Sequence, residues 1–337
     1  MEEVLLSPLR FNGPVSGRCR SRQVCPPALI VSAALLILNA TCGAQPQAPV
    51  PVPWLKSWRD ATVALGKKVT IPSSTGDAKP QEMFLIGGTG VLFRVEGSKV
   101  PWLVTAKHVV KVSPEPDAPM QKSIRLRFSW FESRSVTDYL GIEIPLEDAK
   151  GTALVVLHDS ADLACFPLNI SVEEAGAKSA PALAGLEDMA KSDEIFAGAS
   201  TMILGYPSAI EPTFWTRAVL RGGIISWVSP ANPDMEPILV DSTVTYGHSG
   251  GPAFRVPTGL DQFGNFSVGG RPAFLGIVSQ LRYQPMLPTI AGKPFPIKGP
   301  EGRQVDFNSL MSIGVLEPPG HVRQLLEKAA ILVKANQ

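Results

Sequence analysis

Short apolar runs, separated by polar segments or by glycine and proline, recur along most of this chain. Each run has the length of a β-strand rather than of a helix. The runs form two groups: Met83–Phe93, Pro101–Val110, Ile124–Phe131, Leu140–Ile144, Ala153–Leu157 and Asp162–Leu168, then Thr201–Tyr206, Thr216–Ile225, Pro237–Val244, Pro252–Val256, Ala273–Leu281 and Ser309–Val315. Each group suits one antiparallel barrel. The pattern therefore predicts an all-β fold of two antiparallel six-stranded β-barrels.

The segments outside these runs complete the expected organisation. Residues 171–195 are rich in Ala, Glu, Gly, Lys and Ser and have no strong strand pattern, so we place the inter-barrel linker there. A helical period of apolar residues follows Pro318-Pro319 and predicts a C-terminal helix. The expected boundaries are 45–79 for a Pro-rich spacer and lead-in (with a short helix or lead-in strand at Trp54–Lys68), 80–170 for the N-terminal barrel, 196–319 for the C-terminal barrel and 320–337 for the helix.

The first 44 residues have a different character. Four arginines precede an apolar stretch, Pro26 to Ala40, which ends near Cys42-Gly43-Ala44. Positive charge, a short apolar run and small residues before a cut are typical of a secretory signal peptide. The apolar run is shorter than the roughly 20 residues that span a bilayer. We therefore predict a signal peptide over residues 1–44, no other membrane association, and a periplasmic or extracellular protein.

Composition narrows the possible partners and the compartment. The chain has 337 residues, 32 prolines, 30 glycines and a formal net charge of +1. Balanced charge without a basic run beyond the N-terminus argues against a nucleic-acid partner. Of the four cysteines, the predicted cut leaves Cys165, so we expect no internal disulfide. This fits a bacterial envelope protein.

Three separate stretches carry residues suited to nucleophilic catalysis. Gly247-His248-Ser249-Gly250-Gly251-Pro252 places a serine among small residues. The apolar run ending in Thr105-Ala106-Lys107-His108 supplies a histidine, and Asp162 precedes the apolar Leu163-Ala164-Cys165-Phe166. A serine hydroxyl needs a base to take its proton, and that base needs an acceptor to fix its tautomer. Asp159 competes with Asp162, but Asp162 directly abuts the apolar run and is preferred.

Taken together, these motifs and their order along the chain resemble the chymotrypsin/trypsin-like serine peptidases. Gly87–Phe93 and Leu275–Ser279 are similar to two further strands of that family, so the resemblance covers about residues 80 to 330. It implies a secreted serine endopeptidase that hydrolyses protein or peptide substrates through an acyl-enzyme, without a cofactor or metal. The chain looks like the protease part of Deg-type enzymes without a PDZ-type domain.

The resemblance also assigns roles. Ser249 would be the nucleophile, His108 the general base and then acid, and Asp162 the group that orients His108. The backbone amides of Gly247 and Ser249 would form the oxyanion hole. His248 stands where the family usually has Asp or Asn, which argues against activation by insertion of a freed N-terminus. We expect His248 on the solvent side of the turn.

The family motifs, counted from the nucleophile, also assign substrate binding to three further residues. Thr243 would lie at the floor of the primary pocket and Leu281 at its wall, while Ser279 would support the triad aspartate with its hydroxyl and pair its backbone with the substrate. Thr243 is not acidic, so a preference for Arg or Lys is not supported. We predict a small or medium uncharged residue before the cleaved bond.

Two other functions remain open from the sequence. Residues 247–251 also fit the Gly-x-Ser-x-Gly elbow of α/β-hydrolases, with Asp306 and His321 following in the required order. However, that elbow must lead into a helix, and Pro252–Pro257 has the pattern of a strand. The second alternative is a catalytically weak or latent binding module on the trypsin fold. The sequence has no metal-ligand spacing, phosphate loop or cofactor motif.

Overall fold

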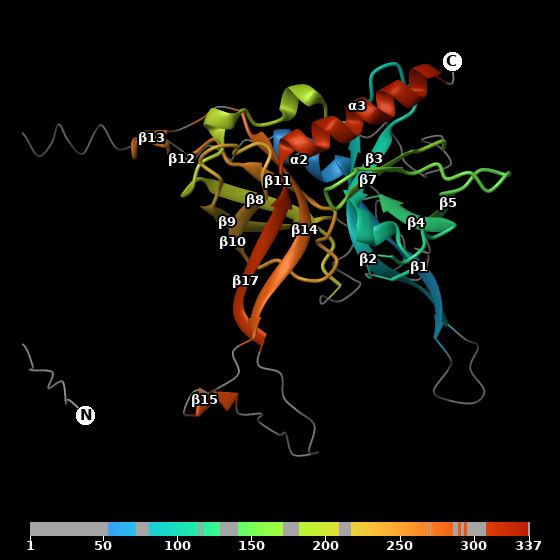
Figure 1. The fold of residues 1–337 in the computed structure, drawn as a ribbon, viewed down its shortest axis with the longest axis horizontal. Helices are drawn as coiled ribbons and strands as arrows, with labels where there is room; N and C mark the ends of the chain where they lie inside the picture. The colour runs from blue at the N-terminus through green and yellow to red at the C-terminus, as the bar shows by residue number, and fades with distance from the viewer. Residues whose placement is uncertain are drawn as a thin grey trace, which may run out of the picture. The chain divides into compact units, whose positions relative to one another are not determined.

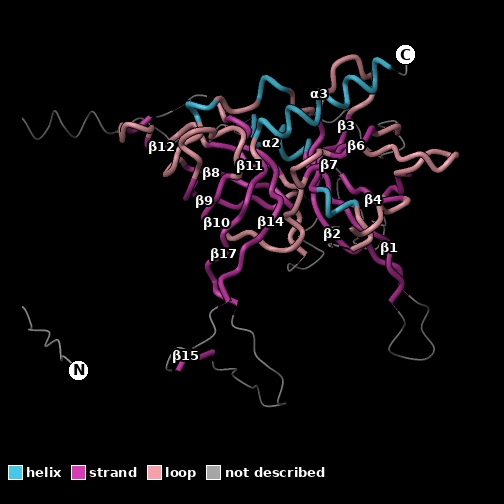
Figure 2. The backbone as a smooth tube through the Cα atoms, viewed as in Figure 1, coloured by secondary structure: helices cyan, strands magenta, loops and turns pink. Residues whose placement is uncertain are grey.

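The computed structural model describes most of the chain after its N-terminal segment. The described residues are 53–71, 81–113, 115, 117–128, 141–170, 182–208, 217–267, 269, 271–285, 289–290, 293–294 and 308–335. The predicted signal peptide and residues 45–52 of the predicted spacer lie outside them. Figure 1 shows two groups of strands with the helix α3 (Pro319–Ala335) lying across both, and Figure 2 shows how little of the rest is helical.

The first group of strands forms one antiparallel sheet in the order β5-β4-β1-β2-β3-β7-β6, counted over the described residues. The strands are β1 (Thr62–Ile71), β2 (Gln81–Phe93), β3 (Trp102–Ala106), β4 (Ser123–Phe128), β5 (Ile142–Pro145), β6 (Val156–Leu157) and β7 (Leu163–Pro167). The end strands β5 and β6 are short and do not pair with each other in the described part. This half is therefore an open half-barrel rather than a closed six-stranded barrel.

The first half-barrel begins earlier than the predicted boundary at residue 80. The segment Trp54–Lys68 holds both of the expected alternatives, because the helix α2 (Pro53–Ala61) leads directly into β1. Strand β1 pairs with β2, with Thr62 opposite Val91, and with β4, with Val63 opposite Phe128. Residues 62–66 of β1 are buried on both faces, with Val63 and Leu65 in one apolar cluster and Ala64 in another, which is why β1 belongs to the sheet and not to a spacer.

The second group of strands forms a closed antiparallel barrel in the order β10-β17-β14-β11-β8-β9, within the part of the chain that the structure describes. The strands are β8 (Ser200–Gly205), β9 (Val219–Trp227), β10 (Ile238–Ser242), β11 (Pro252–Arg255), β14 (Ala273–Pro285) and β17 (Asn308–Glu317). Two small hairpins, β12–β13 (Gly259–Leu260, Phe266–Ser267) and β15–β16 (Thr289–Ile290, Lys293–Pro294), form separate two-stranded sheets. The predicted fold class, two β-barrels with a C-terminal helix, is confirmed.

One apolar core joins the two groups of strands. Trp58 of α2 stacks on Phe274 with ring centroids 5.7 Å apart and also contacts Phe254 at 5.2 Å. Val322 and Leu325 of α3 are buried in the same cluster. The helices α2 and α3 therefore cover apolar surface that both sheets share. None of the helices in the described residues is long and apolar enough to cross a membrane.

The described part of the predicted linker is packed rather than extended. Residues 171–181 lie outside the described part, while 182–195 contain two short 3₁₀-helices, η3 (Leu186–Asp188) and η4 (Ser192–Glu194). Ala184 bridges to Phe93 of β2, and Met189 bridges to Phe274 of β14. This segment therefore ties one sheet to the other.

Candidate active site

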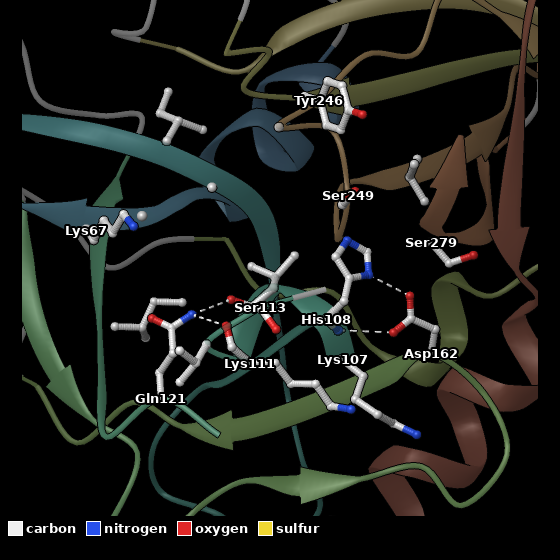
Figure 3. A pocket seen from close by; sticks show the side chains of 18 of the residues that line it. Lys67, Lys107, His108, Lys111, Ser113, Gln121, Asp162, Tyr246, Ser249 and Ser279 are labelled. Carbon is white, nitrogen blue, oxygen red and sulfur yellow. Dashed lines mark hydrogen bonds and ion pairs between the residues drawn. The ribbon is translucent and has the colours of Figure 1, made fainter. Parts of the chain in front are cut away.

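A cleft of about 1160 Å³ lies between the two groups of strands. His108 and Asp162 line it from the first sheet, and Ser249 lines it from the loop before β11. Figure 3 shows the His108 ring between Ser249 and Asp162. The structure thus brings together the three residues that the sequence placed far apart.

Adjacent strands explain why His108 and Asp162 meet. The end of β3 pairs with the start of β7, with Ala106 opposite Leu163. The chain leaves β3 through the short 3₁₀-helix η1 (Lys107–Val110), so His108 lies directly beside the residue that precedes β7. His108 Nδ1 is 2.7 Å from Asp162 Oδ2, and the backbone N–H of His108 donates to Asp162 Oδ1 at 3.1 Å. Both carboxylate oxygens are therefore used to orient the histidine.

The Ser249 loop is fixed by glycines and by one threonine of the first sheet. Gly247 and Gly250 have positive φ values, 93° and 86°. A Cβ on Gly250 would lie 1.9 Å from Thr89 O, so only glycine fits there. The fully buried Thr89 donates its N–H to Ser249 O at 2.7 Å and its hydroxyl to Gly247 O at 2.6 Å. Thr89 is a functional residue that the sequence reasoning noted only as part of a glycine-rich strand.

The amides of the loop are available for a ligand. Over the described residues, neither the Gly247 N–H nor the Ser249 N–H donates a hydrogen bond to the protein. The neighbouring amides do: His248 N–H donates to Thr245 O and Gly250 N–H to Val278 O. No hydrogen bond joins Ser249 Oγ to His108 in this part of the structure. Such bonds are commonly long without substrate and shorten when it binds.

His248 lies in the interior of the loop, so its predicted place on the solvent side is wrong. Its side chain is fully buried, and Nδ1 is 3.1 Å from Thr245 O and 3.2 Å from Thr245 N. Nε2 is buried without a hydrogen-bond partner in the described residues. Burial lowers the pKa of His248 to about 4, against a reference value of 6.5. The ring is therefore neutral at pH 7 and fills space beneath the nucleophile.

The three residues predicted to bind substrate have different outcomes. Thr243 is exposed and does not line the cleft, whereas Val244 and Thr245 do. Thr243 was chosen because it lies six residues before the nucleophile. A tight turn, in which Val244 N–H donates to Ser242 O at 2.7 Å, follows the end of β10, so that spacing does not identify a residue of the cleft. Leu281 lies in β14 opposite Gly314, but its side chain is outside the described part.

Ser279 lines the cleft but does not support Asp162 with its hydroxyl. It is buried, and its Oγ donates to Val315 O at 3.2 Å across the β14–β17 pair. A hydroxyl has one proton to donate, so that bond leaves none for the carboxylate. The support predicted from Ser279 is therefore wrong, because its rotamer satisfies a strand carbonyl.

Asp162 is instead supported through its backbone, by a residue that the sequence reasoning missed. Its N–H donates to Glu317 Oε1 at 3.1 Å, and Glu317, which is buried, has its other oxygen 3.1 Å from His321 Nδ1. Glu317 ends β17 just before α3. The sequence shows only a glutamate directly before the prolines that precede the predicted helix, and nothing in a linear pattern shows which backbone group it reaches.

The helix α3 makes three more hydrogen bonds to the segment that precedes Asp162. Gln324 Oε1 is 3.0 Å from His158 Nε2. Lys328 Nζ donates to Leu157 O at 3.1 Å and to Asp159 at 2.7 Å. Asp159, the competing candidate, is thus used by this lysine, which lowers its pKa. We call residues 157–162 the aspartate loop, and the helix holds it along its length.

The α/β-hydrolase alternative does not fit this structure. The residue after the nucleophile loop, Pro252, begins the strand β11 rather than a helix. His321 is engaged by Glu317 and packs against the His158 ring, with centroids 5.0 Å apart. Asp306 lies outside the described residues. The fold itself consists of antiparallel barrels, not alternating strands and helices.

Two antiparallel β-barrels with a cleft between them, followed by a C-terminal helix, define the trypsin-like fold. The chain matches the model of the trypsin-like peptidase domain over residues 88–259, just over half of its length. It belongs to that family and is a peptidase-type hydrolase. No curated protein matches the chain.

Two solved structures are similar to it. An HtrA-type protease, AlgW, with a decapeptide shares 17% identity at a TM-score of 0.40, covering 82% of this chain and 67% of that one. Rv3671c from M. tuberculosis H37Rv, a serine-to-alanine mutant in its inactive form, shares 16% identity at a TM-score of 0.37, covering 85% and 92%.

Proposed function

We propose that the protein is a serine endopeptidase that uses Ser249, His108 and Asp162 as its catalytic triad. The observation that carries the proposal is the pair of hydrogen bonds that Asp162 accepts from His108. With Oδ2 accepting from Nδ1–H, the lone pair of His108 is on Nε2, the ring atom available to Ser249. Family membership supports the reaction class, and the cleft supports a polymeric substrate.

In the proposed first half-reaction, Ser249 Oγ attacks the carbonyl carbon of the substrate while His108 Nε2 takes its proton. The oxyanion accepts hydrogen bonds from the amides of Gly247 and Ser249, which donate to no other described group. His108 then gives the proton to the leaving amine, and the C–N bond breaks. An ester joins the acyl group to Ser249.

In the second half-reaction a water molecule attacks the ester. His108 takes a proton from the water and returns one to Ser249 Oγ, which releases the acid product. Asp162 stays ionised throughout and stabilises the protonated imidazole. Removing the charge of such an aspartate costs about 10⁴ in kcat, and removing the nucleophile about 10⁶.

A fluorophosphonate probe tests the activated serine directly. We expect labelling of the purified chain to be lost in Ser249→Ala and strongly slowed in His108→Ala and Asp162→Asn. Ser279→Ala is the matched control, because this serine lines the same cleft and its hydroxyl is bound to a carbonyl. Cleavage of a proteome-derived peptide library by the unlabelled wild type, with the labelled protein as the inactivated control, then tests for endopeptidase activity.

Two results would contradict the proposal. An unlabelled wild type that is folded by circular dichroism would indicate a latent or non-catalytic module. Labelling that persists in His108→Ala and disappears in His321→Ala would assign the base to the other histidine.

A further inference from the structure

The charges that line the cleft are strongly unequal in sign. Its lining includes four lysines, Lys67, Lys107, Lys111 and Lys122, whereas the one carboxylate in the lining is Asp162, held by His108, over the residues that the structure describes. The chain as a whole has 31 basic and 30 acidic residues. Overall composition therefore does not produce this excess, which is a property of the cleft.

Two of these lysines are exposed and have no carboxylate partner among the described residues: Lys67 of β1 and Lys122 before β4. Their neighbours on the same strands are paired. Lys68 Nζ is 2.6 Å from Glu82, and Arg125 is 2.9 Å from Glu143. Lys107 donates to the carbonyl of His158 at 2.8 Å, and both Lys107 and Lys111 are half-buried. Lys67 and Lys122 are thus the two exposed lysines of the cleft lining.

Strand pairing places these two lysines near each other. In the β1–β4 pair Gly66 is opposite Arg125, so Lys67 follows that pair on one strand while Lys122 precedes it on the other. The segment before β4 is fixed because the side chain of Gln121 donates to Val109 O at 3.0 Å and to Lys111 O at 2.7 Å. Both lysines thus stand on an ordered part of the first sheet. We call them the lysine pair.

The lysine pair lies on the side of the cleft that the leaving amine faces. Under the proposed function, the acyl half of a substrate is held by the Gly247 and Ser249 amides and by β14. The amine half points to His108, which protonates it, and continues over the first sheet. In Figure 3, Lys67 is across His108 from Asp162, and Leu85 and Ile86 line the cleft beside this wall.

We propose that the lysine pair binds acidic side chains of the substrate on the C-terminal side of the cleaved bond. The substrate class is therefore a protein or peptide segment with Asp or Glu within a few residues after the cut. This inference rests on the proposed function for its direction along the cleft. Exposed ion pairs are individually weak and screened by salt. Two such ion pairs together give about a tenfold higher kcat/KM for substrates with Asp or Glu after the cut than for neutral substrates at low ionic strength. This ratio falls to near one at about 1 M salt.

The test uses peptide-library cleavage by the wild type, the double variant Lys67→Gln/Lys122→Gln, and Lys68→Gln. Lys68 is the matched control: it is adjacent in sequence and equally charged, but bound to Glu82 and absent from the cleft lining. We expect Asp and Glu to be enriched after the cut for the wild type and for Lys68→Gln, and the enrichment to disappear in the double variant. Equal enrichment in all three proteins would overturn the inference, as would no enrichment in the wild type.

A binding measurement separates this inference from the proposed function. Fluorescent decapeptides rich in Glu or in Gln are titrated into Ser249→Ala, with and without the lysine substitutions. Tighter binding of the Glu peptide that depends on the lysine pair supports the inference even if the wild type is not labelled by fluorophosphonate. Equal binding of both peptides overturns it even if the wild type is an active peptidase.

Discussion

The buried His248 makes the stability of the protein depend on pH in a way that can be calculated. Its pKa is about 4 in the folded chain against 6.5 as reference, because burial disfavours the charged ring. Between these two pH values the unfolded chain binds more protons than the folded one, so the free energy of unfolding rises with pH. At neutral pH the neutral His248 contributes about 3 kcal/mol to the free energy of unfolding, relative to acid pH, and about 2 kcal/mol of this contribution is already lost at pH 5.

Urea denaturation at pH 7.5 and pH 5.0 measures this loss. Both measurements are made in Ser249→Ala, so that self-cleavage does not interfere, and repeated with His248→Asn added. Asparagine does not titrate, and every other ionisable group is shared, so the pH-dependent loss should be about 2 kcal/mol smaller in the asparagine variant. Equal losses in the two proteins would refute the reasoning, whatever the absolute stability of the variant.

Further variants test the contacts around the cleft. Glu317→Ala should lower the free energy of unfolding by about 1–3 kcal/mol and slow fluorophosphonate labelling, because the Asp162 N–H loses its acceptor. Glu317→Gln keeps an acceptor oxygen and should restore the labelling rate. Equal labelling rates in the wild type and both variants would contradict this. Gly250→Ala should lower the free energy of unfolding by about 3 kcal/mol or more and abolish labelling, because its Cβ would overlap Thr89 O at a positive φ. A melting temperature equal to that of the wild type would contradict this. Burial raises the pKa of the Cys165 thiol, so iodoacetamide should modify it in urea and not in the folded protein; modification of both would mean that the site opens.

The strand pattern was informative because each barrel strand buries one side or both. The predicted runs in the second barrel match β8, β9, β10, β11, β14 and β17 to within a few residues. Two features escaped the pattern. Strand β1 was expected only as one alternative for a lead-in before the first barrel, whereas it pairs with β2 and β4 inside the sheet. The first sheet stays open in its described part because its end strands are too short to pair, which depends on distant partners rather than on local sequence.

The site was predictable where one residue carries the chemistry and not where neighbours position it. His108, Asp162 and Ser249 each stood in a recognisable motif, and the structure places them in one cleft. Their supports are tertiary: Glu317 reaches Asp162 across 155 positions. The Ser279 hydroxyl and the Thr243 position were misassigned because a rotamer and a tight turn decide them. The catalytic roles, the signal peptide and the envelope location stay predictions.

The hold of β17 and α3 on the aspartate loop has a consequence for the order of synthesis. Glu317, Gln324 and Lys328 contact residues made 155 to 171 positions earlier. During translation the segment with Asp162 is made before Glu317, which accepts the Asp162 N–H, and before Lys328, which donates to Leu157 O. The hydrogen bonds that fix the aspartate loop therefore form only after β17 and α3 have been made. Until then the segment with Asp162 lacks the contacts that position it in the folded protein.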